Sequence, residues 1–77
     1  METSHYRYPV RLEDRQRRWL ETMVRMSGTP AKHYLVARVL LMSEQSQDEP
    51  NHTDGQIAEV LGISRRTVIR IKQRFVQ

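Results

Sequence analysis

The side chains with the clearest chemical potential in this sequence are five basic residues near its end. Residues 62–77 contain no acidic residue, whereas residues 44–61 contain five acidic residues and no Lys or Arg; the basic residues are Arg65, Arg66, Arg70, Lys72 and Arg74. A segment with one sign of charge attracts partners of the opposite sign, and guanidinium groups pair well with phosphate oxygens. The pattern indicates a polyanion as the partner. A solvated helix face is the alternative explanation of a basic helix.

Length and composition restrict the other kinds of chemistry. The chain has 77 residues, a formal net charge of +4 and no cysteine. A chain of this size forms one small core and seldom a deep catalytic cavity as well. We find no glycine-rich phosphate loop, no nucleophile beside a base and no carboxylate cluster outside the polar loop. We therefore expect no catalytic residue, no enzyme activity, no cofactor and no small-molecule substrate.

The same composition bears on metals and membranes. His5, His33 and His52 are far apart without paired spacing, so we expect surface roles for them and no metal site. The longest largely apolar stretch, residues 34–42, is far shorter than the ~20 residues of a membrane-spanning helix. We expect no membrane contact, and the absence of cysteine fits a reducing cytoplasm or bacterial nucleoid.

Apolar periodicity predicts two helices in the first half of the chain. The first spans about residues 13–27, with Gly28 as its C-terminal stop. The second begins with Thr29 as N-cap and Pro30 at the first helical position, and its pattern ends after Ser46. Its apolar residues nearly encircle its second half, as in a central helix. We expect Trp19, Met23, Met26 and Tyr34 to be core or helix-packing residues.

The second half predicts two short helices around a tight turn. Residues 53–56 fit a capping box for a helix that ends at Leu61. Gly62 can adopt the left-handed conformation that terminates this helix. Ser64 can cap a further helix over residues 65–76. A polar loop, residues 47–51, connects these helices to the first half.

This second half has the features of a helix-turn-helix. Two short helices that cross steeply need a small residue at the crossing, a bend and an apolar seam. Ala58 and Gly62 provide the first two; the seam is Ile57, Leu61, Ile63, Val68 and Ile71. We predict an all-α fold, a small bundle of about four helices spanning residues 12–77, with the helix-turn-helix at 54–76. A helical bundle without any nucleic-acid role is the alternative.

In a helix-turn-helix, the second helix enters the major groove of double-stranded DNA. With Val68, Ile71 and Phe75 against the core, the outer face holds the candidates for base readout: Arg65, Arg66, Ile69, Arg70 and Gln73. The candidates for phosphate contacts are Ser64, Thr67, Lys72 and Arg74. For each arginine, a phosphate contact without sequence information is the alternative, because half or more of such hydrogen bonds go to the backbone.

Two further basic segments have less specific patterns. Residues 1–11 have no apolar period, so we predict an extended N-terminal arm whose Arg7 and Arg11 can enter a minor groove. The first helix carries Arg15, Arg17, Arg18 and Arg25, which form a solvated face or touch the DNA backbone.

The order of these features resembles a known family. The matching runs are Arg7–Leu12, Gly28–Pro30, Ala37–Leu41, Thr53–Glu59, Leu61–Val68 and Arg74–Phe75. They resemble the N-terminal domain of bacterial insertion-sequence transposases of the mariner superfamily. The resemblance implies a homeodomain-like or paired-domain-like module that binds the element's terminal inverted repeats in transposition and DNA recombination.

In that family, a separate C-terminal domain with three carboxylates and two metal ions cuts the DNA. The resemblance therefore implies that this chain binds DNA and does not cut it. As further partners we consider a homodimer and a catalytic transposase domain or chain. A free-standing transcriptional regulator of the repressor or antitoxin kind, and a protein-interaction module, remain as alternatives.

Overall fold

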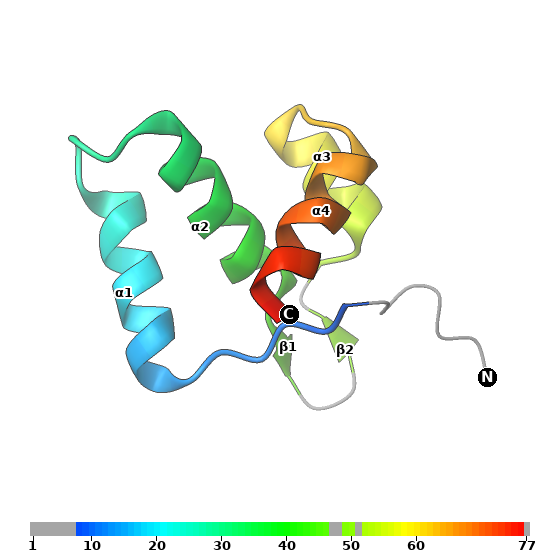
Figure 1. Cartoon of the computed structure of the whole chain (residues 1–77), viewed down its shortest axis with the longest axis horizontal. Helices are drawn as coiled ribbons and strands as arrows, with labels where there is room; N and C mark the ends of the chain where they lie inside the picture. The colour runs from blue at the N-terminus through cyan, green and yellow to red at the C-terminus, as the bar shows by residue number, and fades with distance from the viewer. Residues whose placement is uncertain (1–7, 47–48, 51, 77) are drawn as a thin grey trace.

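A computed structural model describes residues 8–46, 49–50 and 52–76 of the chain. Its helices are α1 (Asp14–Arg25), α2 (Ala31–Ser43), α3 (Asp54–Leu61) and α4 (Arg65–Val76), and two short strands, β1 (Gln45–Ser46) and β2 (Glu49–Pro50), pair antiparallel. The predicted all-α bundle of four helices with a helix-turn-helix is confirmed (Figure 1). Strand β2 lies where a polar loop was predicted, whereas β1 lies where the pattern of the second helix was expected to end, because α2 stops at Ser43. Strand pairs this short leave no periodic signal in a sequence.

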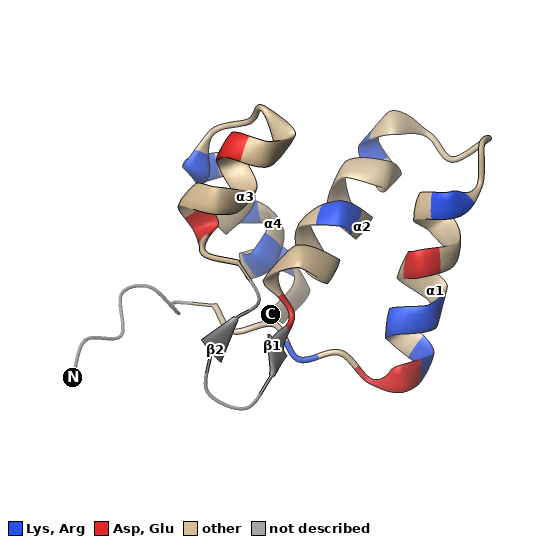
Figure 2. Ribbon diagram, turned by 180° about the vertical axis from the view of Figure 1, so that it is seen from behind, with Lys and Arg blue, Asp and Glu red and all other residues tan. Residues whose placement is uncertain are grey.

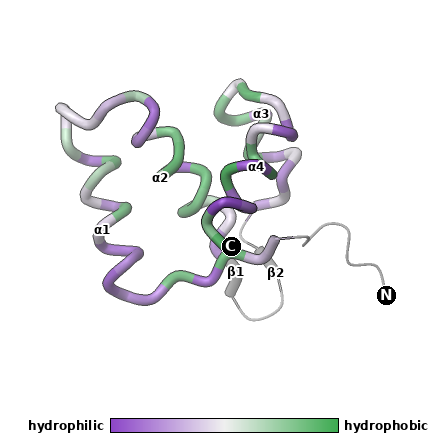
Figure 3. The backbone as a smooth tube through the Cα atoms, in the orientation of Figure 1, coloured by the Kyte–Doolittle hydropathy of each residue, from purple (hydrophilic) through white to green (hydrophobic). Residues whose placement is uncertain are grey.

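Helix α2 lies between α1 and the α3–α4 pair (Figure 1). It contributes to two hydrophobic clusters through different faces. In the first cluster, Ala37 and Leu40 pack with the N-terminal segment and α1. In the second cluster, Val39 packs with α3 and α4. Ile71 of α4 touches both clusters. This double contact explains the nearly encircling apolar pattern of the second half of α2, which is largely green in Figure 3.

The turn between α3 and α4 has the predicted chemistry. The Thr53 hydroxyl accepts a hydrogen bond from the Gln56 backbone N–H at 3.1 Å, and the Gln56 side chain accepts one from the Thr53 N–H at 2.9 Å. Gly62 ends α3 in the left-handed conformation with φ of 71°. The Ser64 hydroxyl accepts from the Thr67 N–H at 3.1 Å, so it caps α4. Hydrogen bonds of this kind can be predicted from the sequence, because they join residues that are close together along the chain.

The turn between α1 and α2 differs from its prediction. Helix α1 ends at Arg25, and its C-cap Met26 is extended. Gly62 is the glycine with positive φ in the described chain, so Gly28 does not end α1 by a left-handed turn. Thr29 does not cap α2 either. Its hydroxyl donates to the Met23 carbonyl at 2.7 Å, back toward α1, and Pro30 occupies the N-cap position.

The last part of the predicted arm belongs to the core. Residues 1–7, including Arg7, lie outside the described residues. Val10 is fully buried in the cluster with Leu20 and Leu40, and it forms an isolated parallel bridge with Glu44. The predicted boundary between an arm of residues 1–11 and the domain is therefore wrong, because one apolar side chain before Leu12 supplies part of the core.

An ion pair joins α1 to the end of α2. Arg17 Nε donates to both carboxylate oxygens of Glu44 at 3.0 Å, and its Nη1 donates to Asp14 at 2.8 Å. The hydrogen bonds to Glu44, and then those to Asp14, raise the pKa of Arg17. Arg17 therefore does not belong to a freely solvated face of α1.

Several residues expected in helix contacts lie outside them. Trp19 is 65% exposed and Met26 is 57% exposed. Tyr34 is also exposed, and the Arg38 guanidinium lies over its ring and donates to its hydroxyl at 3.0 Å. Of the four residues, Met23 packs against the first cluster as predicted.

Among the described helices, none has the length and apolar character required to cross a membrane.

Candidate nucleic-acid interface

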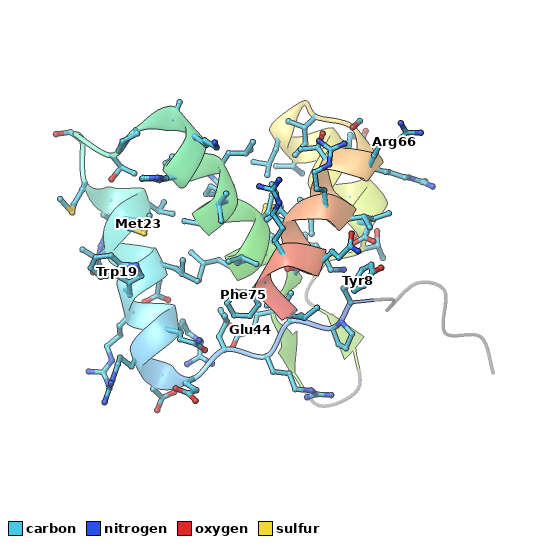
Figure 4. All side chains as sticks on the ribbon, in the orientation of Figure 1. Tyr8, Trp19, Met23, Glu44, Arg66 and Phe75 are labelled. Carbon is cyan, nitrogen blue, oxygen red and sulfur yellow. The ribbon has the colours of Figure 1, made fainter. Side chains whose placement is uncertain are left out.

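Helix α4 has a buried side and a basic side. Val68 is fully buried, Ile71 packs on both clusters and Phe75 packs on the first cluster, as predicted. Figure 4 shows Phe75 and Arg66 on opposite sides of this helix. The orientation of α4 therefore directs its apolar residues inward and leaves a basic face open.

The basic face contains a continuous stripe of four side chains. Arg66, Ile69, Arg70 and Gln73 have the spacing i, i+3, i+4 and i+7, which places them on one side of a helix. Arg66 and Arg70 are exposed, and Ile69 and Gln73 are half-buried. We call these four residues the α4 ridge. A ridge with two donor forks, an amide and an apolar contact has the side-chain types that read base edges in a major groove.

The charge of α4 is not neutralised on this face. In Figure 2 the helix carries Lys and Arg and no acidic residue, whereas α1 carries both signs. Arg65, Arg66, Arg70 and Arg74 are all exposed, and within the described residues none of them forms an ion pair. Four unneutralised guanidinium groups on one helix produce a local positive potential that favours a polyanion.

Arg65 lies apart from the ridge. A Cβ at Gly55 of α3 would be 3.0 Å from Arg65 Nη2 and 3.2 Å from its Nε, so the guanidinium lies against the first turn of α3. Glycine at position 55 leaves room for this approach. The side chain therefore reaches toward α3, and its predicted grouping with the base-reading residues does not match its position. Sequence spacing alone does not reveal this contact.

Lys72 does not lie on the open surface. Its side chain is 3% exposed, and its Nζ donates to Asp54 Oδ1 of α3 at 2.6 Å. The prediction that Lys72 contacts phosphate is contradicted by this position, because a buried, paired ammonium is not available to an external anion. The sequence did contain a signal of this burial. Lys72 is four residues after Val68, and residues at this spacing lie on the same side of a helix, which here is the buried side. The structure assigns Lys72 to holding α4 against α3.

The remaining predicted phosphate contacts lie at the two ends of α4. The hydroxyls of Ser64 and Thr67 are 3.0 Å apart at its start, where Ser64 is exposed and Thr67 is half-buried. Arg74 is exposed near the other end and lines an apolar groove between α2 and α4. Hydroxyls and N–H groups at a helix start, together with a distant guanidinium, have the chemistry to bind two separate phosphates.

Other predicted candidates are placed as follows. Arg11 is exposed between the buried side chains of Val10 and Leu12, far along the chain from the ridge. His52 is half-buried, and its Nδ1 donates to the Met42 carbonyl at 3.2 Å, so it has a structural contact rather than a free surface role. No group of three His, Cys, Asp or Glu residues in the described part of the chain is arranged to hold a metal ion.

Comparison with known proteins agrees with this geometry. No curated protein and no solved structure is similar enough to the chain to match. A family model described as a homeodomain-like domain matches residues 30–77, which include α2, α3 and α4 and more than half of the chain. A homeodomain-like helix-turn-helix suggests DNA as the partner. Because this model matches more than half of the chain, and the matched residues include the helix-turn-helix with its basic second helix, the chain belongs to the homeodomain-like domain family.

Proposed function

We propose that this chain binds double-stranded DNA sequence-specifically, with α4 in the major groove. The observation that carries the proposal is the α4 ridge, because it opposes the buried Val68 and holds two exposed arginines with no acidic residue nearby on the helix. In this arrangement Arg66 and Arg70 pair with guanine O6 and N7, and Ile69 meets a thymine methyl group. Gln73 is suited to adenine.

The flanking residues then set the position of the helix on the duplex. Ser64 and Thr67 hold a phosphate at the start of α4, and Arg74 holds one near its end. Arg65 contacts the backbone from its place over α3, because that helix crosses the phosphates in a helix-turn-helix. Such contacts increase affinity for every sequence and carry no base preference.

The DNA that fits best with the sequence features is the terminal inverted repeat of an insertion sequence. The ordered resemblance to transposase N-terminal domains supports this assignment. On this proposal the chain binds the repeat in the bacterial nucleoid and does not cut it, and cleavage belongs to a separate metal-dependent catalytic domain or chain.

Selection of bound duplexes from a random pool, followed by footprinting, tests both levels of the proposal. Enrichment of one sequence that occurs at element ends supports the transposase assignment. Enrichment of a sequence upstream of a host promoter instead assigns the chain to transcriptional regulation. If no sequence is enriched and no duplex is bound, the DNA-binding proposal is wrong.

Replacement of a ridge residue separates base readout from charge. Arg66→Ala is expected to reduce affinity for the selected site by ~1–3 kcal/mol and to relax preference at one or two base pairs. Arg25→Ala removes an exposed positive charge from α1 and serves as the matched control, with a small effect on all sequences. Equal losses on selected and unrelated duplexes would make Arg66 a backbone contact.

Salt dependence measures the number of phosphate contacts. With Lys72 engaged by Asp54 and with Arg66 and Arg70 on base edges, Arg65 and Arg74 are the charged phosphate contacts of α4. At ~0.9 per contact, log K plotted against log salt is expected to have a slope of about −2. Lys72→Met, if the variant is folded, is expected to leave this slope unchanged, whereas Arg74→Gln reduces its magnitude by about one.

A further inference from the structure

A small apolar groove lies between α2 and α4, away from the α4 ridge. Val36 and Leu40 of α2 form one wall, and Ile71 and Phe75 of α4 form the other, with Arg74 at the edge. The cavity volume is about 210 Å³. This volume is comparable to one large apolar side chain, and no described residue of the chain fills it.

The groove has a single type of charge at its edge. Arg74 is exposed and, in the part of the chain that is described, forms no ion pair. Helix α4 contains no acidic residue that could neutralise it. A guanidinium beside an apolar cavity is complementary to a carboxylate that follows an apolar side chain, because both groups are satisfied together.

The position of the groove separates it from the ridge. Ile71 and Phe75 lie on the side of α4 that faces the first cluster, whereas Figure 4 shows Arg66 on the other side. Arg74 lies between the two surfaces on the helix, at i+4 from Arg70 and i+3 from Ile71. A ligand in the groove can therefore contact Arg74 without covering the α4 ridge.

We propose that this groove binds a segment of a partner protein in which a bulky apolar residue is followed by Asp or Glu. The apolar side chain enters the cavity between Leu40 and Phe75, and the carboxylate accepts hydrogen bonds from Arg74. A DNA backbone offers anions without an apolar anchor, so the lining of the groove favours a protein segment. The proposal does not require DNA binding by the ridge, but the proposed function also uses Arg74, so the peptide carboxylate and the phosphate near the end of α4 compete for this residue.

Three capped peptides of equal length test the proposal on the full chain by NMR titration. One contains Phe-Glu, the second contains Phe-Gln and the third contains Ala-Glu. The expected result is binding of the Phe-Glu peptide with shifts centred on Val36, Leu40, Ile71 and Phe75, and at least about threefold weaker binding of the other two. Equal binding of all three, or shifts centred elsewhere, overturns the proposal.

Two variants locate the interaction. Arg74→Gln is expected to weaken the Phe-Glu peptide about threefold to tenfold and to leave the Phe-Gln peptide unchanged. Arg66→Gln, which removes a charge on the ridge, is the matched control and is expected to leave both peptides unchanged. Equal weakening by the two substitutions would reduce the effect to net charge and overturn the carboxylate contact. The spectrum of each free variant reports whether it is folded.

A titration with duplex DNA distinguishes the groove from the ridge. On the proposed function, a duplex shifts resonances of Arg66 and Arg70 and leaves those of Val36 and Leu40 in place. If a duplex shifts the groove residues as the peptide does, the groove is part of the DNA surface and the partner proposal is wrong. If the peptide binds and no duplex does, the groove proposal stands and the proposed DNA function fails.

Discussion

The domain contains two helix pairs, α1–α2 and α3–α4, which are joined by similar means but differ in how their turns are built. Each pair has a glycine in its turn, and among the described residues an ion pair joins α1 to the C-cap of α2 and another joins α3 to α4. In α3–α4 the glycine is left-handed and both helix starts are capped by side chains. In α1–α2 the glycine has no positive φ, and Thr29 bonds backward to Met23.

The ion pair between α3 and α4 is also less exposed than the ion pair between α1 and the end of α2. Lys72 and Asp54 have side chains that are 3% and 15% exposed, whereas Arg17 is 34% exposed beside Glu44. The pair that holds the ridge-bearing helix is thus more deeply buried and has defined local caps at its turn. The comparison shows that the turn between α3 and α4 is specified by local caps and a left-handed glycine, whereas the turn between α1 and α2 is held by the bond from Thr29 back to Met23.

The largest expected difference concerns apolar positions in α4 and α1. Val68→Asp places a carboxylate at a fully buried position and is expected to cost several kcal/mol, comparable to the ~5–15 kcal/mol stability of a domain. Trp19→Asp, at a 65% exposed position, is expected to cost about 1 kcal/mol or less. Thermal unfolding followed by circular dichroism compares them. Cooperative unfolding of Val68→Asp near the unmodified temperature would contradict the placement of the core.

The two ion pairs give the next effect. Lys72→Met leaves Asp54 largely buried without its cation and is expected to cost about 3 kcal/mol of unfolding free energy. Arg17→Met also leaves a largely buried carboxylate, since the Glu44 side chain is 16% exposed, but Arg17 itself is 34% exposed, so water can take its place and the expected cost is smaller. Urea unfolding of both variants measures the difference. A larger loss of stability for Arg17→Met than for Lys72→Met would contradict the expected order of the two ion pairs. The double variant Lys72→Met with Asp54→Leu tests whether an apolar pair restores stability.

The two turn glycines are expected to respond in opposite directions. Gly62→Ala forces a Cβ into a left-handed conformation and is expected to cost about 1–2 kcal/mol. Gly28→Ala meets no atom within 4 Å and has no positive φ, so it is expected to stabilise the domain by up to ~1 kcal/mol. A loss of stability for Gly28→Ala would show that the two turns are more alike than the geometry indicates.

The smallest expected effect is at Gly55, inside α3. Gly55→Ala raises helix propensity and is expected to stabilise the domain by ~0.4–1 kcal/mol, because the neighbouring Arg65 guanidinium is the end of a flexible side chain and can move. NMR of the Arg65 Nε–H group follows the displacement. Destabilisation would show that the contact of Arg65 with α3 contributes more than the gain in propensity.

Several features of the α3–α4 pair were predicted correctly from sequence because they depend on neighbours along the chain. The capping box at Thr53, the left-handed Gly62 and the Ser64 cap each involve residues no more than four positions apart. The inward direction of Val68 and Ile71 follows from helical periodicity. The same periodicity places Arg66 and Arg70 on the exposed side of α4, opposite these buried residues.

Other features depend on residues that are distant in sequence, and only the tertiary structure decided them. Lys72 meets Asp54 across two helices, Arg65 reaches Gly55, and Val10 enters the core beside Leu40. The exposure of Trp19 belongs to this class, because an apolar residue at helical spacing is buried only where another element covers it. The sequence by itself determined the helices, the tight turn and the excess of positive charge, since these arise from local hydrogen bonds and residue type. Which of those charges remain available to a partner is set by how the helices pack, and that arrangement exists only in the folded chain.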